Sequence, residues 1–164
     1  MPLVLIANRA PLRPTASGWA PAAGGLTTAL LPVLDKRGGA WVAMREPDEN
    51  APDVQPIPGG HATVYRVPLT AAEVDAYYLG MSNRVLWPLS HYLVDHVEPD
   101  RAFRDAYAAV NERFAEAALA AAEALPTARF WVHDYHLMHV PAHLRKARPD
   151  ARIGVFWHIP WPAP

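Results

Sequence analysis

Three short apolar runs, each ending in polar side chains, constrain the fold of this chain more than any other feature. The runs and the polar groups that end them are "PLVLIANR" with Asn8 and Arg9, "ARFWVHD" with His133 and Asp134, and "ARIGVFWHIP" with His158. Apolar runs of this length, rich in β-branched and aromatic residues, are typical of buried strands. If the strands are parallel, their carboxyl ends share one edge of the sheet, which is where open α/β sheets bind ligands. The pattern therefore predicts a site for a polar, anionic small molecule at that edge.

The second half of the chain supports a parallel sheet. The segment 99–124 is the clearest helix, because Phe103, Tyr107, Val110 and Phe114 recur at helical spacing on one apolar stripe. From there the pattern alternates between helix and strand, which calls for crossover connections between parallel strands. We expect an α/β fold with a Rossmann-like, mostly parallel sheet and helices on both faces, and residues 1–164 as a single domain.

The remaining elements follow from local signals. Thr70 and Glu73 form a capping-box pattern that begins a helix, which we expect to continue through 82–97 with an interruption or kink near Pro88. Residues 12–23 are expected to form a loop because they contain two prolines and Gly18. The other expected elements are helices at 24–38 and 136–149, strands at 40–44 and 62–69, and a loop or hairpin between those two strands.

Charge and composition exclude several classes of function. The chain has 164 residues, no cysteine and a formal net charge of −1. It lacks the basic footprint of a nucleic-acid-binding or membrane-surface protein. The apolar start has no basic segment before it and is too short for a signal or a membrane span. The absence of cysteine fits a reducing compartment, so we expect a cytoplasmic protein without nucleic-acid or membrane partners.

The histidines of "FWVHDYHLMHVPAHLRK" raise the alternative of a metal site. His139 and His143 are four residues apart and would share one face of a helix. A zinc site needs three or four converging ligands, and the change from strand to helix near Asp134 would send His133 in another direction. No glutamate follows His139 to act as the base of a zinc protease. We expect no metal and no cofactor, with His139 and His143 as ordinary helix residues.

Two weaker signals suggest phosphate binding. Gly24 and Gly25 precede a predicted helix, where backbone amides and the helix dipole can hold an anion. Neither the dinucleotide-binding nor the P-loop fingerprint is present, so a simple turn into the helix remains an alternative. Arg9 directly follows the first strand and could bind a phosphate with two hydrogen bonds, or form a surface ion pair.

Several motifs together resemble one family. "ANRAP", "GGLTTAL", "YYLGMSNRVLWPLSHY", "WVHDYHLM" and "IGVFWHIPWP" stand in the order found in trehalose-6-phosphate synthases, and the similarity runs almost from end to end. The resemblance is to the N-terminal half of these enzymes. It implies the N-terminal domain of a GT-B glycosyltransferase, a fold of two Rossmann-like domains facing across a cleft. It also implies transfer of glucose from a nucleotide sugar to glucose 6-phosphate with retention, without an enzymic nucleophile.

The resemblance assigns roles to particular residues. Arg9, Tyr78 and Trp87 would bind the acceptor phosphate, and Trp41 would wall the acceptor pocket. Asp134 would bind acceptor hydroxyls near the reacting centre. The donor-side residues are Gly24 and Gly25, with the Gly25 amide on the diphosphate, and His158 on the donor glucose. Asp134 and His158 are thus the candidate catalytic residues.

The departures from the family pattern leave alternatives open. Met44 stands where the family often has a second tryptophan, which puts the shape of the acceptor pocket in question. The domain that would bind the UDP-, GDP- or ADP-glucose donor is expected to lie outside these 164 residues, so the chain alone is expected to be inactive. The alternatives are a non-catalytic binding or regulatory module, a glucosylglycerol-phosphate synthase and a pseudo-glycosyltransferase. A homo-oligomer formed through the exposed cleft face is a further expectation.

Overall fold

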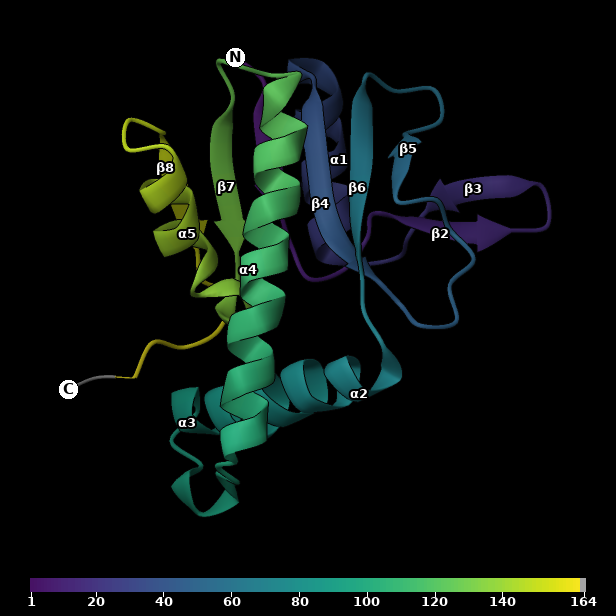
Figure 1. The fold of residues 1–164 in the computed structure, drawn as a ribbon. Helices are drawn as coiled ribbons and strands as arrows, with labels where there is room; N and C mark the ends of the chain where they lie inside the picture. Colours follow the sequence, from purple (N-terminus) through teal and green to yellow (C-terminus); the bar gives the residue numbers. More distant parts are fainter. Residues whose placement is uncertain (163–164) are drawn as a thin grey trace.

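A six-stranded sheet forms the centre of the molecule (Figure 1). The computed structural model describes residues 1–162. In sheet order the strands are β5 (Val54–Pro56), β6 (Ala62–Pro68), β4 (Gly39–Arg45), β1 (Leu3–Ile6), β7 (Arg129–His133) and β8 (Ile153–Phe156). Only β5 pairs antiparallel, with β6, and the other neighbours are parallel. The expected α/β fold with a mostly parallel sheet is confirmed, and the stretch before β6 is the hairpin connection.

Helices cover both faces of the sheet, as expected. Helix α1 (Gly25–Arg37) packs with Leu30 and Leu34 on the face that carries Leu5 and Trp41. On the opposite face lie α4 (Arg101–Glu123) and α5 (Val140–Ala147). Because successive strand residues point to opposite faces, continuous apolar runs such as that of β1 feed both layers of the core.

The expected loop at 12–23 is wrong, because the structure has a second small sheet there. Strands β2 (Leu12–Thr15) and β3 (Gly18–Pro21) pair antiparallel as a hairpin that projects from the β5–β6 side of the molecule (Figure 1). Gly18, with φ of 123°, makes the tight turn possible. The prolines are tolerated because a two-stranded ribbon has only edge strands, where a missing N–H costs no ladder bond.

The helical region after β6 departs from the expected single kinked α-helix. The Thr70 capping box is present and opens a short α2 (Ala71–Glu73). A π-helix, η1 (Val74–Leu86), follows and leads into α3 (Trp87–Ser90). The helix ends at Ser90 rather than at residue 97, because Tyr92 adopts a left-handed conformation with φ of 60°. The 3₁₀ turn η2 (Val94–His96) completes the segment.

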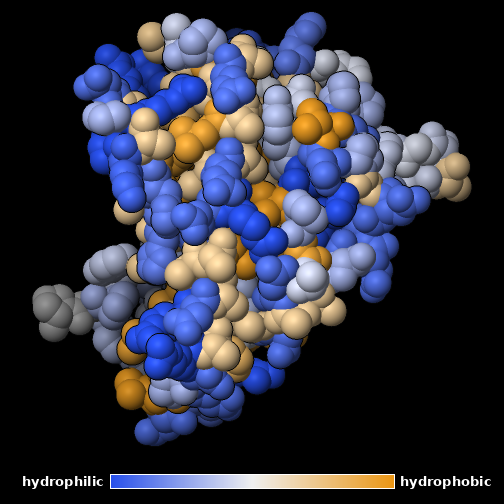
Figure 2. All heavy atoms as spheres, viewed as in Figure 1, coloured by the Kyte–Doolittle hydropathy of each residue, from blue (hydrophilic) through white to orange (hydrophobic). Residues whose placement is uncertain are grey.

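The expected helix at 136–149 is shorter in the structure. A 3₁₀ turn, η3 (Tyr135–Leu137), comes first, and α5 begins only at Val140, where Pro141 fits the first helical turn. Within residues 1–162, no helix is long and apolar enough to cross a membrane. Exposed apolar side chains gather around α3, where Figure 2 shows orange residues at the lower left; they include Leu89, Leu93 and Val94.

Candidate functional site

The predicted polar edge exists and borders a pocket of about 530 Å³. Strand β1 lies between β4 and β7, and the chain runs from β1 to β4 on one side before returning to β7 on the other. The loops after β1 and β7 therefore diverge at a switch in strand order, which is where open parallel sheets hold ligands. Six of the residues selected from the sequence line the pocket: Arg9, Gly24, Gly25, Trp41, Tyr78 and Asp134.

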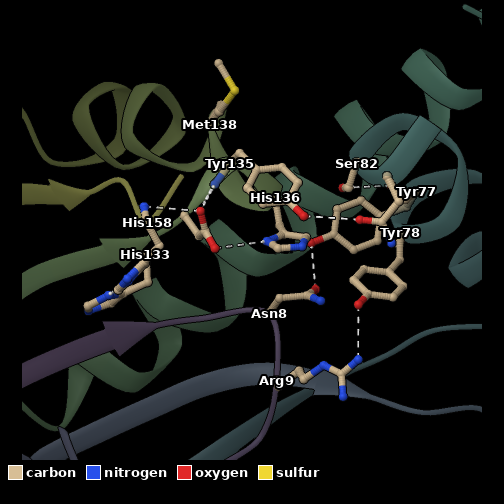
Figure 3. Close-up of polar contacts among 12 residues, drawn as sticks. Asn8, Arg9, Tyr77, Tyr78, Ser82, His133, Tyr135, His136, Met138 and His158 are labelled. Carbon is tan, nitrogen blue, oxygen red and sulfur yellow. Dashed lines mark hydrogen bonds and ion pairs between the residues drawn. The ribbon is translucent and has the colours of Figure 1, made fainter. Parts of the chain in front are cut away.

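Arg9 and Tyr78 form the most direct contact across the pocket. The Arg9 Nη2 group donates a hydrogen bond of 3.0 Å to the Tyr78 hydroxyl (Figure 3). Tyr78 belongs to η1, so the contact joins segments 69 residues apart. The indole N–H of the buried Trp41 donates to the Arg9 carbonyl at 3.1 Å, and this hydrogen bond helps to fix the loop after β1 that carries Arg9. The guanidinium keeps further donors for an anion, since only one of its N–H groups is used by Tyr78.

Asp134 occupies the centre of the site. Its backbone is left-handed, with φ of 73°, which turns the chain sharply at the end of β7. One carboxylate oxygen, Oδ1, accepts the Tyr135 amide at 3.0 Å and the His158 amide at 3.4 Å. The other, Oδ2, lies 3.9 Å from His136 Nδ1, too far for a hydrogen bond. Oδ2 is therefore the oxygen that can accept hydrogen bonds from a ligand hydroxyl.

A buried network from α4 holds the turn that carries Asp134. The Tyr107 hydroxyl donates to the Tyr135 carbonyl at 2.6 Å and accepts from the Met138 amide. Asn111 donates to the His136 carbonyl at 3.1 Å. Burial raises the pKa of Tyr107 strongly, so its hydroxyl remains a donor at neutral pH. Hydrogen-bonded backbone groups keep this short buried turn in one conformation.

His133 and His158 meet edge to edge beside Asp134. His133 Nδ1 and His158 Nε2 are 3.0 Å apart, and the ring centroids are 5.3 Å apart. Burial, together with the neighbouring His158, lowers the pKa of His133 to about 4. Burial also lowers the pKa of His136 to about 4, although Asp134 opposes this shift. Both rings are therefore neutral at pH 7, and the contact of His136 with Asp134 is not an ion pair there.

The histidines do not form a converging set of ligands. Across residues 1–162, no group of three His, Cys, Asp or Glu side chains is placed to hold a metal ion. His139 is the N-cap residue of α5, without a capping hydrogen bond from its side chain, and its ring packs edge-on against Tyr107 while its amide donates to Asn111. His139 is thus part of the support of the turn.

The N-terminus of α1 faces the same pocket. Gly24 is the N-cap, with φ of 142° and no side chain to cap the helix. A Cβ built on Gly25 would meet nothing within 4 Å, so the approach to the first amides is open. The first N–H groups of a helix have no intrahelical partner and carry the positive end of its dipole. This end of α1 can accept an anionic group.

Two of the selected residues lie outside the pocket lining. Trp87, in α3, is 39% exposed and stacks on His91 with a centroid distance of 4.1 Å. His158 is exposed and reaches the site through its contacts with Asp134 and His133 (Figure 3). Their roles remain predictions.

The structure also adds contacts and lining residues to which the sequence analysis assigned no role. Asn8 is 6% exposed, and its Oδ1 accepts the hydroxyl of the buried Tyr77 at 2.8 Å (Figure 3). The position of Asn8 in the polar pair that ends β1 was a signal for it. Other lining residues come from the hairpin and from the loop after β4, and local patterns gave no signal for them; they include Arg13, Pro14, Glu46 and Glu49.

The fold and this site define the class of the protein. A parallel Rossmann-like sheet with helices on both faces and a polar pocket at the switch point matches the N-terminal domain of GT-B glycosyltransferases. The model of "Glycosyltransferase family 20" matches residues 4–164. The chain belongs to this family.

Within this family, the chain is similar to trehalose-6-phosphate synthases. The chain is 42% identical over 168 residues to the trehalose-6-phosphate synthase of Mycolicibacterium gilvum, covering 97% of this chain and 33% of the relative. It superimposes with a TM-score of 0.82 on a trehalose-6-phosphate structure from E. coli bound with UDP-2-fluoro glucose. That match has 35% identity and covers 100% of this chain and 34% of the other.

A second solved structure is the α,α-trehalose-phosphate synthase (UDP-forming) of Burkholderia xenovorans in complex with glucose-6-phosphate. Its TM-score is 0.76 and its identity 34%, over 99% of this chain and 34% of that one. The chain thus spans about a third of the length of its relatives.

Proposed function

We propose that this chain is the acceptor-binding part of a retaining α,α-trehalose-phosphate synthase and that its pocket binds glucose 6-phosphate. The convergence of Arg9, Tyr78 and Asp134 on one pocket carries the proposal, because it pairs a cation for a phosphate with a carboxylate for sugar hydroxyls. The glucose-6-phosphate held by the Burkholderia xenovorans relative supports the same ligand class.

In this proposal each residue contacts a particular group of the acceptor or of the donor. Arg9 and Tyr78 bind the phosphate, with Trp87 beside them, and Asp134 Oδ2 accepts from an acceptor hydroxyl. On the donor side, the amide of Gly25 binds the diphosphate of a nucleotide sugar, and His158 contacts its glucose. Transfer with retention proceeds by attack on the same face of the donor sugar, and the leaving phosphate assists deprotonation of the acceptor.

We also propose that residues 1–164 form one acceptor-binding domain and that the nucleotide-sugar-binding domain lies outside them. Transfer needs positive groups on the leaving phosphate, which are a dominant electrostatic contribution. We therefore expect the isolated chain to bind acceptor without transferring glucose. A cytoplasmic location and a homo-oligomer remain predictions.

Calorimetric titration of the chain with glucose 6-phosphate tests the proposal. We expect weak binding that Arg9→Ala abolishes and Tyr78→Phe weakens, with glucose itself binding far less well because it lacks the phosphate. Arg101→Ala is the matched control, since Arg101 is an exposed arginine outside the pocket lining. An Arg9→Ala variant that binds as well as the wild type contradicts the acceptor role.

The residue at position 44 raises the question of a second candidate acceptor within the family. It lines the pocket where a second tryptophan is the family's frequent choice, so the space beside the ligand differs. A smaller phosphorylated acceptor, such as glycerol 3-phosphate, would keep the Arg9 contact and need less of the pocket. A competition titration decides: displacement of glucose 6-phosphate by an equal concentration of glycerol 3-phosphate favours the second candidate.

A further inference from the structure

Arg66 is a buried charge that the proposed function does not use. It lies in β6, is 3% exposed as a residue, and its side chain is shielded from solvent. Burial lowers its pKa, yet a guanidinium stays protonated at neutral pH. Burying such a charge is costly unless neighbouring groups compensate it. The groups that contact the Arg66 guanidinium therefore indicate its structural role.

The loop after β4 supplies the first partners. Nε lies 3.4 Å from Oε1 of Glu49, and Nη1 donates to the Pro52 carbonyl at 3.0 Å. Glu49 lines the pocket, so Arg66 fixes part of this wall. Nε and Nη2 have no hydrogen-bond partner, and they form the guanidinium edge that a carboxylate binds with two parallel bonds. A small inward movement of Glu49 would satisfy both.

The hairpin supplies the other partner. Arg66 Cζ lies 4.9 Å from the ring centroid of Trp19, which is in β3. A guanidinium at this distance over an indole is held by a cation–π interaction, which is strengthened when the pair is shielded from water. Across the hairpin, Trp19 pairs in register with Pro14, and Pro14 lines the pocket. The same guanidinium thus contacts the hairpin and the loop after β4, and both of these segments contribute residues to the pocket lining.

Apart from the contact of Trp19 with Arg66, the β2–β3 hairpin makes few contacts with the rest of the described residues. In the part of the chain that the structure describes, the hydrogen bonds of Thr15 and Ser17 stay inside the hairpin. Leu12 is buried at its base, but the tip stands clear of the sheet (Figure 1). An isolated two-stranded hairpin is marginally stable in water. Its position over the pocket therefore depends on the contact of Trp19 with Arg66.

We propose that Arg66 is a positioning residue that holds the hairpin, through Trp19, and the loop that carries Glu49 in place as two of the walls of the ligand pocket. This clamp deepens the proposed function and rests on it only for the identity of the ligand. Loss of the clamp leaves Arg9, Tyr78 and Asp134 in place but opens the pocket beside them. The affinity for ligand then falls although the sheet stays folded.

Hydrogen exchange on the 164-residue chain tests the clamp without ligand. In Trp19→Leu we expect the amides of residues 13 and 15–20 to exchange about tenfold faster, while those of β1 and β4 keep their rates. Trp19→Phe keeps an aromatic face over Arg66 and should stay near the wild-type rate. Asp100→Ala, which removes the N-cap of α4 far from the hairpin, is the control for a general loss of stability. A change of less than about twofold in Trp19→Leu overturns the proposal.

Titration with glucose 6-phosphate adds the functional readout. Trp19→Leu should raise the dissociation constant about tenfold, and Trp19→Phe and Asp100→Ala should leave it near the wild-type value. Faster hairpin exchange with an unchanged dissociation constant also overturns the proposal, because the hairpin would then not be a wall of the site. If the wild type does not bind glucose 6-phosphate, the proposed function fails, and the exchange rates alone decide whether Arg66 clamps the hairpin.

Discussion

Replacement of Asn111 tests how the Asp134 turn is held. Asn111 is fully buried in α4, and its side chain bonds two backbone groups of the turn. Nδ2 donates to the His136 carbonyl at 3.1 Å, and Oδ1 accepts the His139 amide at 3.1 Å. In Asn111→Ala the buried His136 carbonyl and the part-buried His139 amide lose these partners.

The expected loss follows from the cost of unpaired backbone groups. A buried acceptor left without a partner costs about 1–3 kcal/mol, and the part-buried His139 amide adds less because water can reach it, so the loss is roughly 1–4 kcal/mol. A water molecule in the vacated space would bring the value to the lower end. This is a large part of the roughly 5–15 kcal/mol that stabilises a typical domain.

Urea unfolding followed by circular dichroism measures the effect on the free energy of unfolding. Glu112→Ala is the matched control, because Glu112 is the exposed neighbour on the same helix and should change stability by less than about 0.5 kcal/mol. If Asn111→Ala is as stable as this control, the network does not hold the turn. A rise in the exchange rate of the His139 amide, without change in the β1 amides, would locate the loss in the turn.

Three further perturbations follow from particular contacts. Stability should fall as the pH is lowered from 6.5 to about 4, because the unfolded chain protonates His133 and His136 while burial lowers their folded-state pKa values to about 4; an unfolding series in pH that is flat over this window contradicts the shift. Gly80→Ala should destabilise by about 1–3 kcal/mol, since a Cβ there would lie 2.5 Å from the Phe103 ring; an unchanged melting temperature would show that Phe103 moves freely. Thr70→Ala should cost about 1 kcal/mol by removing the capping box, measured by urea unfolding, and equal stability would mean that the cap is replaced by solvent.

The strands and the polar ends were accessible to prediction because their signal is local. The apolar run of β1 packs on both faces, and the order of helix and strand after residue 99 implies the parallel pairing that the structure has. The family motifs identified Arg9, Tyr78 and Asp134, which share one pocket. The roles of these residues stay predictions.

The hairpin and the π-helix were not accessible, because their signals are tertiary. Prolines in 12–23 indicate a loop, yet the hairpin is held by Trp19 lying on Arg66, 47 positions further along the chain. The close contact of Gly80 with Phe103 likewise depends on the packing of η1 against α4. Neither contact leaves a periodic pattern in its own segment.

The sequence by itself determined the sheet, its buried strands and the edge where polar groups collect, since hydrophobic periodicity and strand ends are properties of neighbouring residues. Only the tertiary structure decided which residues enclose the pocket. Arg9 meets Tyr78 across 69 residues, and Asn111 holds the His136 carbonyl across 25. Such contacts depend on how the helices pack on the sheet, because a few ångströms of packing decide whether two distant side chains bond.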